Sequence, residues 1–446
     1  MDEFLKEIQM TVFKEWIMMQ KYDNYHIYLD KDDNICLESK YGIGQIIFNP
    51  LNIIELKVMN KNTQETVFYL HFQMNNIKHA LELFYQMQEC ILSLTNNTKI
   101  KVLLSCTGGL TTSYFVFKVE EAIKLLDLNI EMNAISYTSL EQEGSNYDII
   151  LLAPQISYLH AKVQEMFKDK KVINIPPKIY AKYDVGELLS IIINSYKQPI
   201  KRNNIDILKI KDNRKILSLT IYRNKERIHL TYNLYHQGNI IITNDIIKSK
   251  ISLYDIYDAL DSLIVKYQDI EIIALALPGI LYNGKLSSTY ITDIDDIELK
   301  IKQRYKQKVI ITNDANAAVV GYYSLQDKYK NLMFLFQPAS LNAGAGIIID
   351  GKLIKGNHHF AGEVSFINTT LPNSKEVLIK MILSTICIID PQVIVLFSDL
   401  INDVNELKLE IEKTIPNDFI PEIVKVNNVL DYILLGQMIL SIQEGG

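Results

Sequence analysis

The chain has 446 residues, more than a single hydrophobic core normally supports, so we expect two or three domains. Hydrophobic residues make up 48% of the chain and charged residues 22%, a balance that excludes long disordered segments. The net charge of -6, without a dense cluster of Lys or Arg, argues against binding to nucleic acid.

No apolar run reaches the roughly 20 residues that a membrane span requires, and the chain begins with an acidic segment unlike a signal peptide. The four cysteines are scattered and contain no C-x-x-C pair, which argues against a zinc site or a disulfide framework. We therefore expect a soluble cytoplasmic protein with reduced thiols and no bound metal. The cysteines are Cys36, Cys90, Cys106 and Cys387.

Residues 1–97 are predicted to form a small α+β domain of unknown role. A helical stretch, FLKEIQMTVFKEWIMM, precedes short alternating runs such as HIYLD and ETVFYLHFQM, and a second helix, NNIKHALELFYQMQECILSL, follows them. His71 and His79 lie near the last strand and helix, and we expect structural rather than catalytic roles for them. The second helix should bury a stripe formed by Leu81, Phe84, Tyr85, Gln88 and Ile91.

Residues 98–198 alternate between strand and helix patterns, which predicts a parallel sheet with helices on its faces. The expected strands are KVLLS, NIEMNAIS, YDIILLAP and KVINI. Such short apolar runs are typical of strands that are buried on both faces. The pattern therefore indicates a second domain of the α/β class with four parallel strands.

The first of these strands ends at a loop, CTGGLTTS, with the features of a phosphate-binding site. Gly108 and Gly109 allow backbone N–H groups to turn toward an anion, and the helix that follows adds the positive end of its dipole. Such a field favours a thiolate, so Cys106 is well placed to accept a phosphoryl group. The alternative is a buried structural cysteine beside a threonine that caps the helix. The hydroxyl groups expected to bind the phosphate belong to Thr111, Thr112 and Ser113.

The domain resembles the enzyme IIB component of lactose/cellobiose-type bacterial phosphotransferase systems, whose loop runs C-x-x-G-x-S-T-S after the first strand. Two further landmarks of that family occur here as LLAPQISYLH and IPPKIYAKYDVGELL. The resemblance implies that Cys106 receives phosphate from a phosphohistidine on a IIA-type partner protein. Those systems pass the phosphate to a sugar in a membrane IIC component. The acceptor here stays open between a separate IIC component and a regulator.

A polar, basic run between 197 and 214 is predicted to link to a third domain, residues 214–446. Its motifs ALALPG, ITNDANAAVVG, AGAGIIIDGKLIKG and FAGEVSF occur in the order and spacing of the ROK group of sugar kinases and repressors, which this domain resembles. The resemblance implies a two-lobed, actin/hexokinase-like fold and a homodimer. It also implies that Asn313 and Asp314 bind and deprotonate a sugar hydroxyl, and that Glu363 contacts the sugar.

Three glycine-rich loops that hold ATP in ROK kinases have lost most of their glycines here. LTIYRNKE (219–226) stands in place of D-x-G-G-T, SLNAGAG (340–346) in place of G-T-G-x-G-x-G, and VLFSDL (395–400) in place of V-x-G-G-G. Bulky side chains cause strain and steric conflict at positions that need positive φ or backbone contact with phosphate. We therefore expect poor ATP binding and regard Asp314 as a vestigial base.

The sugar side departs from the ROK pattern as well. The segment GEVSF places Phe366 where the family has a histidine, and the zinc-binding C-x-C-G-x-x-G-C loop is absent. His358 and His359 precede this segment without thiolate partners, so no metal site is expected. Phe366 could instead stack on a sugar ring.

The leading hypothesis is a regulatory protein in which Cys106 reports phosphotransferase flux and the ROK-like domain senses a small sugar without phosphorylating it. It requires no cofactor beyond the phosphoryl group on Cys106. The first alternative is an active sugar kinase that uses ATP and Mg²⁺. The second is a ROK-type DNA-binding repressor, which would carry an N-terminal helix-turn-helix whose pattern residues 1–97 lack.

Overall fold

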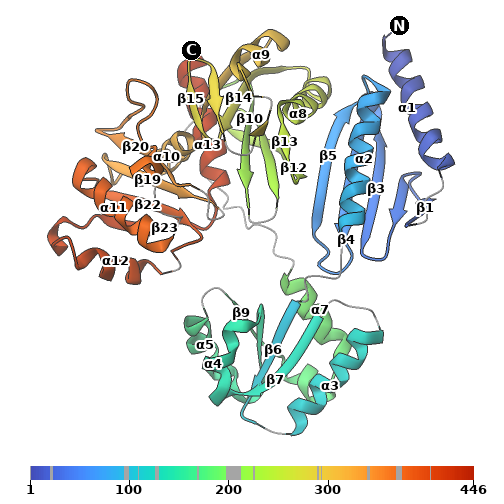
Figure 1. The fold of residues 1–446 in the computed structure, drawn as a ribbon, viewed down its shortest axis with the longest axis vertical. Coiled ribbons are helices and arrows are strands. Elements are labelled where there is room, and N and C mark those ends of the chain that lie inside the picture. Colours follow the sequence, from blue (N-terminus) through green and yellow to red (C-terminus); the bar gives the residue numbers. More distant parts are fainter. Residues whose placement is uncertain are drawn as a thin grey trace.

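The structure, a computed structural model, shows an N-terminal α+β unit, a parallel α/β unit and a two-lobed α/β unit (Figure 1). This arrangement confirms the predicted fold class. The predicted linker between 197 and 214 falls mostly outside the described residues. No helix within the described ranges is long and apolar enough to cross a membrane. The described residues are 2–20, 24–94, 100–108, 110–125, 130–167, 170–196, 212–224, 227–288, 291–292, 294–338, 342–367, 374–401 and 403–445.

The N-terminal unit is an antiparallel meander covered by helix α2 (Ile77–Ser93). Buried and less buried positions alternate along β3 and β4, as a sheet with one face on a core requires. Asn76 caps α2, because its side chain accepts a hydrogen bond from Lys78 N at 2.8 Å. The other elements are α1 (Asp2–Met19), β1 (His26–Leu29), β2 (Ile35–Glu38), β3 (Gly42–Asn49), η1 (Pro50–Asn52), β4 (Ile53–Asn60) and β5 (Thr66–Gln73).

The buried face of α2 differs from the predicted stripe. Tyr85 is 48% exposed and lies edge-on to Trp16 of α1, with ring centroids 6.4 Å apart. Leu81 is only partly buried. The helix turns its face toward β3 and β4, so the amphipathic tyrosine covers a neighbouring ring at the surface. The buried side chains are Ala80, Leu83, Phe84, Met87, Gln88, Cys90 and Ile91.

The sheet of the N-terminal unit continues into the first lobe of the C-terminal unit. Strand β5 pairs antiparallel with β12, where Tyr69 is opposite Ile247, and the result is one ten-stranded sheet. Its order is β1-β2-β3-β4-β5-β12-β11-β10-β14-β18. Pairing β5 removes an exposed strand edge, which would otherwise attract other chains. The strands of the first lobe are β10 (Lys215–Arg223), β11 (Ile228–His236), β12 (Asn239–Lys248), β14 (Ile270–Leu277) and β18 (Lys308–Asn313).

We call this junction the seam. It has β5 and α2 on one side and β12 and α8 (Leu253–Lys266) on the other, and two histidines lie in it. His71 is buried, with Nδ1 2.6 Å from Ser262 Oγ and Nε2 2.9 Å from Tyr232 Oη. His79 Nε2 lies 2.8 Å from a carboxylate oxygen of Asp258. Both histidines therefore connect the N-terminal unit to the first lobe.

Residues 100–196 form the predicted four-stranded parallel sheet, in the order β7-β6-β8-β9. Strands β6 and β8 are buried along almost their whole length, in accord with their continuous apolar sequences. The strands are β6 (Ile100–Cys106), β7 (Ile130–Ser136), β8 (Ile149–Leu152) and β9 (Lys171–Asn174). The helical segments are α3 (Leu110–Leu125), η2 (Tyr137–Ser139), α4 (Leu140–Glu143), η3 (Gly144–Asn146), η4 (Pro154–Leu159), α5 (His160–Met166), α6 (Pro177–Lys182) and α7 (Val185–Tyr196).

The second lobe is a five-stranded sheet in the order β21-β20-β19-β22-β23. Helices α10 (Asp314–Ser324) and α13 (Leu430–Gly445) pack together between the two lobes (Figure 1). Their approach is close, because a Cβ on Gly321 would lie 2.0 Å from Tyr432 O and one on Gly436 1.8 Å from Ala317 O.

The remaining elements complete this unit. In the second lobe they are β19 (Leu332–Gln337), β20 (Gly344–Ile349), β21 (Lys352–Leu353), η5 (Val364–Ile367), α11 (Lys375–Ile389), β22 (Val393–Ser398), α12 (Val404–Glu412), η6 (Asn417–Phe419) and β23 (Glu422–Lys425). In the first lobe they are β13 (Ile251–Ser252), β15 (Ile280–Tyr282), β16 (Lys285–Ser287), β17 (Ile291–Thr292) and α9 (Ile297–Arg304).

Candidate functional site

Cys106 ends strand β6, and its sulfur accepts a hydrogen bond from the backbone N–H of Gly108 over 3.2 Å. Gly108 has φ of 102°, a conformation that favours glycine, while no atom lies within 4 Å of a Cβ built on it. Backbone conformation, rather than crowding, therefore calls for glycine. Gly109 lies outside the described residues.

Hydroxyl groups gather near this cysteine at the carboxyl ends of the parallel strands. Ser136, the last residue of β7, is opposite Cys106 in the strand register, and its Oγ lies 2.6 Å from Thr138 Oγ1. The buried Thr112 hydroxyl is 2.6 Å from Tyr180 Oη, which ties α3 to the IPPKIY segment. Ser113 is exposed, and the side chain of Thr111 lies outside the described residues.

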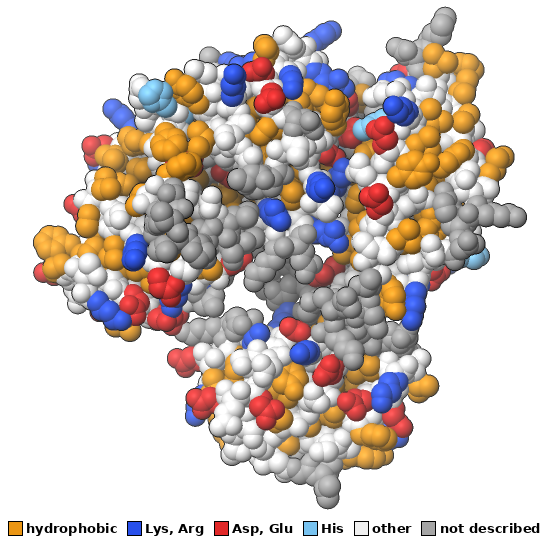
Figure 2. Space-filling view, viewed as in Figure 1, with side chains coloured by type: hydrophobic (Ala, Val, Ile, Leu, Met, Phe, Trp, Pro, Cys, Tyr) orange, Lys and Arg blue, Asp and Glu red, His pale blue; other side chains and the backbone are white. Residues whose placement is uncertain are grey.

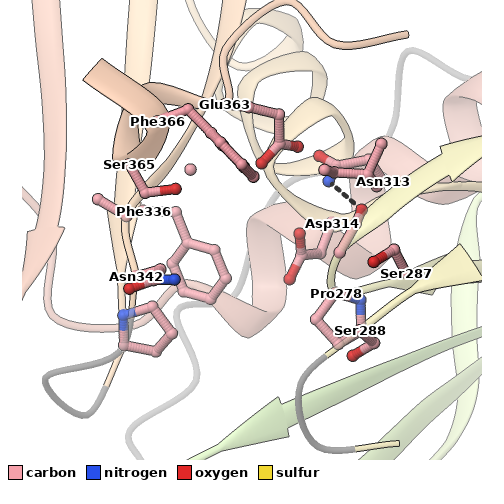
Figure 3. Close-up of a pocket in the computed structure, with 15 residues that line it drawn as sticks. Pro278, Ser287, Ser288, Asn313, Asp314, Phe336, Asn342, Glu363, Ser365 and Phe366 are labelled. Atoms are coloured by element: carbon pink, nitrogen blue, oxygen red, sulfur yellow. Dashed lines mark hydrogen bonds between the residues drawn. The ribbon is translucent and has the colours of Figure 1, made fainter. Parts of the chain in front are cut away.

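The second candidate site is a cleft between the two lobes, with a cavity volume of about 170 Å³ (Figure 3). Asn313 caps α10, because its Oδ1 accepts a hydrogen bond from Asn316 N at 3.0 Å and its Nδ2 donates to Gly279 O at 2.9 Å. Asp314, the first residue of α10, accepts a hydrogen bond from Ala315 N at 2.8 Å. The structure thus brings Asn313 and Asp314 together with Glu363, as the sequence predicts.

The two carboxyl groups that face this cleft both have raised pKa values. The pKa of Asp314 is raised to about 7, chiefly by burial. The hydrogen bond from Ala315 N opposes this shift, and the nearby Glu363 adds to it. Burial also raises the pKa of Glu363. A carboxyl group that titrates near neutral pH can both accept and donate a hydrogen bond to a hydroxyl ligand.

Two glycines shape the walls of the cleft. Gly279 has φ of 117°, and a Cβ there would lie 2.1 Å from Ser287 O. Gly362 has φ of 92°, and a Cβ there would lie 1.8 Å from Ala345 O. Ala345 N donates to Gly362 O at 2.7 Å, so the segment carrying Glu363 is held directly against β20.

The rim of the cleft includes three serines that the sequence did not indicate as site residues. Ser287, Ser288 and Ser365 line it with Phe366 (Figure 3). The buried Ser288 Oγ has no hydrogen-bond partner among the described residues, so it is available to a polar ligand. Phe366 is 55% exposed, and its ring lies 5.1 Å from that of Phe360. No sequence signal marked the serines, because only the fold brings them to the cleft.

An aromatic cluster lies beside this cleft and joins the two lobes. Tyr222 of β10 stacks on Phe336 of β19 with ring centroids 6.4 Å apart, and Phe397 of β22 lies 5.7 Å from Phe336 and 6.2 Å from Tyr222. Burial raises the pKa of Tyr222 to about 12. Tyr222 and Phe397 belong to segments 219–226 and 395–400, two of the three compared above with glycine-rich loops. Phe336 belongs to the strand that leads into the third, 340–346.

Metal-binding groups do not converge in the described part of the chain, where no set of three or more His, Cys, Asp or Glu side chains is arranged to hold an ion. His358 and His359 lie beside the Tyr282 ring, with centroids 5.2 and 6.5 Å from it.

Residues 101–190 match the profile of the lactose/cellobiose-specific IIB subunit of the phosphotransferase system, and residues 236–375 match that of the ROK family. The chain therefore joins a IIB-type region to a ROK-type region in one polypeptide, as the motifs predict.

Curated relatives match the ROK-type part over short stretches. A xylose repressor from Caldicellulosiruptor bescii is 39% identical over 66 residues, 14% of this chain and 16% of the repressor. An N-acetylmannosamine kinase from Yersinia pestis is 32% identical over 113 residues, 24% of this chain and 38% of the kinase. The chain thus spans well under half of either relative. A solved structure, a proposed N-acetylmannosamine kinase from Listeria monocytogenes, aligns over 52% of this chain and 100% of its own at 17% identity, with a TM-score of 0.44.

Proposed function

We propose that this protein is a regulator linked to the phosphotransferase system. Cys106 accepts a phosphoryl group from the phosphohistidine of a IIA-type protein, and the ROK-type domain binds a small sugar without phosphorylating it. The protein acts in the cytoplasm and passes its signal to a membrane IIC component or to another regulator. The observation that carries this proposal is the contrast between the two sites. The cysteine loop donates a backbone N–H, that of Gly108, to the Cys106 sulfur, whereas the region beside the interlobe cleft is packed with aromatic rings.

The cysteine loop suits phosphoryl acceptance in three ways. The hydrogen bond from Gly108 N stabilises negative charge on the sulfur, and the N-terminus of α3 follows directly. The serine and threonine hydroxyls at the end of β7 are available to phosphate oxygens. In the transfer, the Cys106 thiolate attacks phosphorus and the N–P bond of the phosphohistidine breaks. The phosphohistidine ring carries a proton on its other nitrogen, so it leaves as neutral imidazole.

The aromatic cluster supports loss of kinase activity. In ROK kinases the three glycine-rich loops meet around the ATP phosphates. Here two of the corresponding segments, and the strand that leads into the third, contribute rings to one packed cluster. Each such ring pair stabilises the packed state by roughly 0.5–1.5 kcal/mol, so opening the cluster for a triphosphate would be costly. Phosphoryl transfer depends mostly on positioning and charge stabilisation, which Asp314 alone cannot supply.

Transfer to Cys106 can be tested by incubating the protein with phosphoenolpyruvate, the general phosphotransferase proteins and a IIA protein. Mass spectrometry of intact protein and of its peptides should find one phosphoryl group on the peptide that contains Cys106. Cys106→Ser should stay unmodified, whereas Cys387→Ser, which changes an exposed cysteine, should be modified as wild type is. A wild-type protein that stays unmodified while a genuine IIB protein is modified would refute the proposal.

An active sugar kinase is the second candidate, and one observation favours it. Asp314 is buried beside the cleft with a pKa of about 7, which suits a general base at neutral pH. The named kinase relative suggests N-acetylmannosamine as a test sugar. A repressor has less support, because residues 24–94 form an antiparallel sheet with a covering helix rather than a three-helix DNA-binding fold.

A further inference from the structure

A cavity of about 600 Å³ lies in the seam between the N-terminal unit and the first lobe. One wall comes from α2 and β5, and the other from the start of β11 and the segment between β12 and α8. Its volume falls within the roughly 300–1,000 Å³ that small-molecule sites usually have. It is separate from both the cysteine loop and the interlobe cleft.

The cavity is lined by three cationic side chains, those of Arg227, Lys248 and Lys250. Figure 2 shows Lys and Arg side chains gathered where the N-terminal unit meets the first lobe. Lys248 is buried and forms an ion pair with Asp255. The other oxygen of Asp255 accepts hydrogen bonds from Ser252 N at 2.8 Å and Ser252 Oγ at 2.9 Å. Both oxygens of Asp255 therefore already have partners, and its charge neutralises Lys248 but neither of the other two cations.

Arg227 and Lys250 form no ion pair with any residue that the structure describes. Arg227 Nε is buried and has no hydrogen-bond partner among the residues that the structure describes. Lys250 is exposed at the mouth of the cavity and forms no ion pair within the described chain. The remaining carboxylate, Glu89 of α2, is exposed, which leaves two cations facing one anion. A buried donor without a partner is costly, so this arrangement favours an anionic ligand.

We infer that the seam cavity binds a small organic phosphate ester, such as a sugar phosphate. The phosphate is held by the Arg227 guanidinium and the Lys250 ammonium. The planar guanidinium can donate two parallel hydrogen bonds to phosphate oxygens, and the ammonium adds a compact positive charge. The cavity is larger than phosphate alone requires, and Gln86 and Ser93 of α2 supply polar contacts for the organic part. A bound ester would contact both walls and hold the N-terminal unit on the first lobe.

The first test is calorimetric titration of the full chain with glucose 6-phosphate, glucose and inorganic phosphate. Glucose 6-phosphate should bind at least about 10-fold more tightly than either of the other two, and binding should weaken with added salt. Arg227→Gln and Lys250→Gln should each weaken it by about 10- to 100-fold. Lys285→Gln, an exposed control far along the chain, should bind as wild type does.

Cysteine alkylation provides a second readout that locates the ligand. Cys90 lines the cavity and Cys387 is exposed elsewhere, so glucose 6-phosphate should slow modification of Cys90 by iodoacetamide and leave Cys387 unaffected. Cys106→Ser should bind the ester normally, which separates this inference from the proposed phosphotransfer. Equal affinity for inorganic phosphate, unchanged binding by Arg227→Gln and Lys250→Gln, or unaltered Cys90 modification would each overturn the inference.

Discussion

The Asp314 carboxyl group couples the folding of this protein to pH. Its pKa of about 7 in the folded state exceeds the 3.8 that is usual for an exposed aspartate, so the folded protein retains a proton that the unfolded chain releases between these pH values. The free energy of unfolding should consequently fall as pH rises through this window. The same burial that prepares Asp314 for a hydroxyl ligand therefore destabilises the empty cleft at neutral pH.

Replacing Asp314 with Asn keeps an oxygen for the hydrogen bond from Ala315 N and removes the titration. We predict that Asp314→Asn is more stable than wild type at pH 8, by up to about 4 kcal/mol, and that the difference disappears near pH 4. Urea denaturation at several pH values measures it, with exposed Asp418→Asn as the control. A stability difference that does not change with pH would contradict this assignment.

Individual site residues differed in how well the sequence predicted them. Asn313, Asp314 and Glu363 were predicted together, because their motifs are local and each is short enough to recognise in one sequence. The packing of Tyr222 with Phe336 was not predictable, because the rings come from strands in different lobes. Their meeting depends on tertiary structure, which residue spacing does not encode.

At the level of elements, most helices and strands follow from their periodicity, but their partners do not. The predicted run ETVFYLHFQM is indeed a strand, β5, yet nothing in its pattern indicates that it joins β12, more than 160 residues later. Helix α2 was also predicted, but the side chains that it buries differ from those of the predicted stripe. Periodicity defines a stripe only approximately, and the neighbours of a helix decide which side is covered.

The histidines of the seam should give opposite responses to pH. Burial lowers the pKa of His71 to about 4, so the stability that depends on its neutral form is lost as pH falls from about 6.5 to 4. The hydrogen bond from His79 to Asp258 raises the pKa of His79, so its contribution is present at low pH and lost as pH rises.

We therefore predict that His71→Gln lowers the free energy of unfolding most at pH 7. At pH 4.5 this loss should be smaller by up to about 3 kcal/mol. His79→Gln should show the opposite trend, with its largest loss at low pH. Thermal unfolding of the two variants at pH 4.5 and 7 provides the comparison. Parallel pH profiles for both variants would show that these side chains do not titrate as the seam requires.

For the whole molecule, the sequence was sufficient to predict the fold class and the pairing of a IIB-type with a ROK-type region. It could not show that the N-terminal unit shares a sheet and a hydrophobic core with the first lobe. That continuity makes the N-terminal unit part of the same body as the lobe that forms one wall of the cleft. A ligand in the seam and a sugar in the cleft would therefore act on the same sheet.

We propose that this protein accepts a phosphoryl group at Cys106 and does not transfer one from ATP to a sugar. The most direct measurement is sugar phosphate formation by wild type and by Asp314→Asn, with Mg-ATP and each test hexose under identical conditions. We predict that wild type forms no more product than Asp314→Asn does. Sustained turnover by wild type that Asp314→Asn abolishes would contradict it, because the cleft would then be a working kinase site.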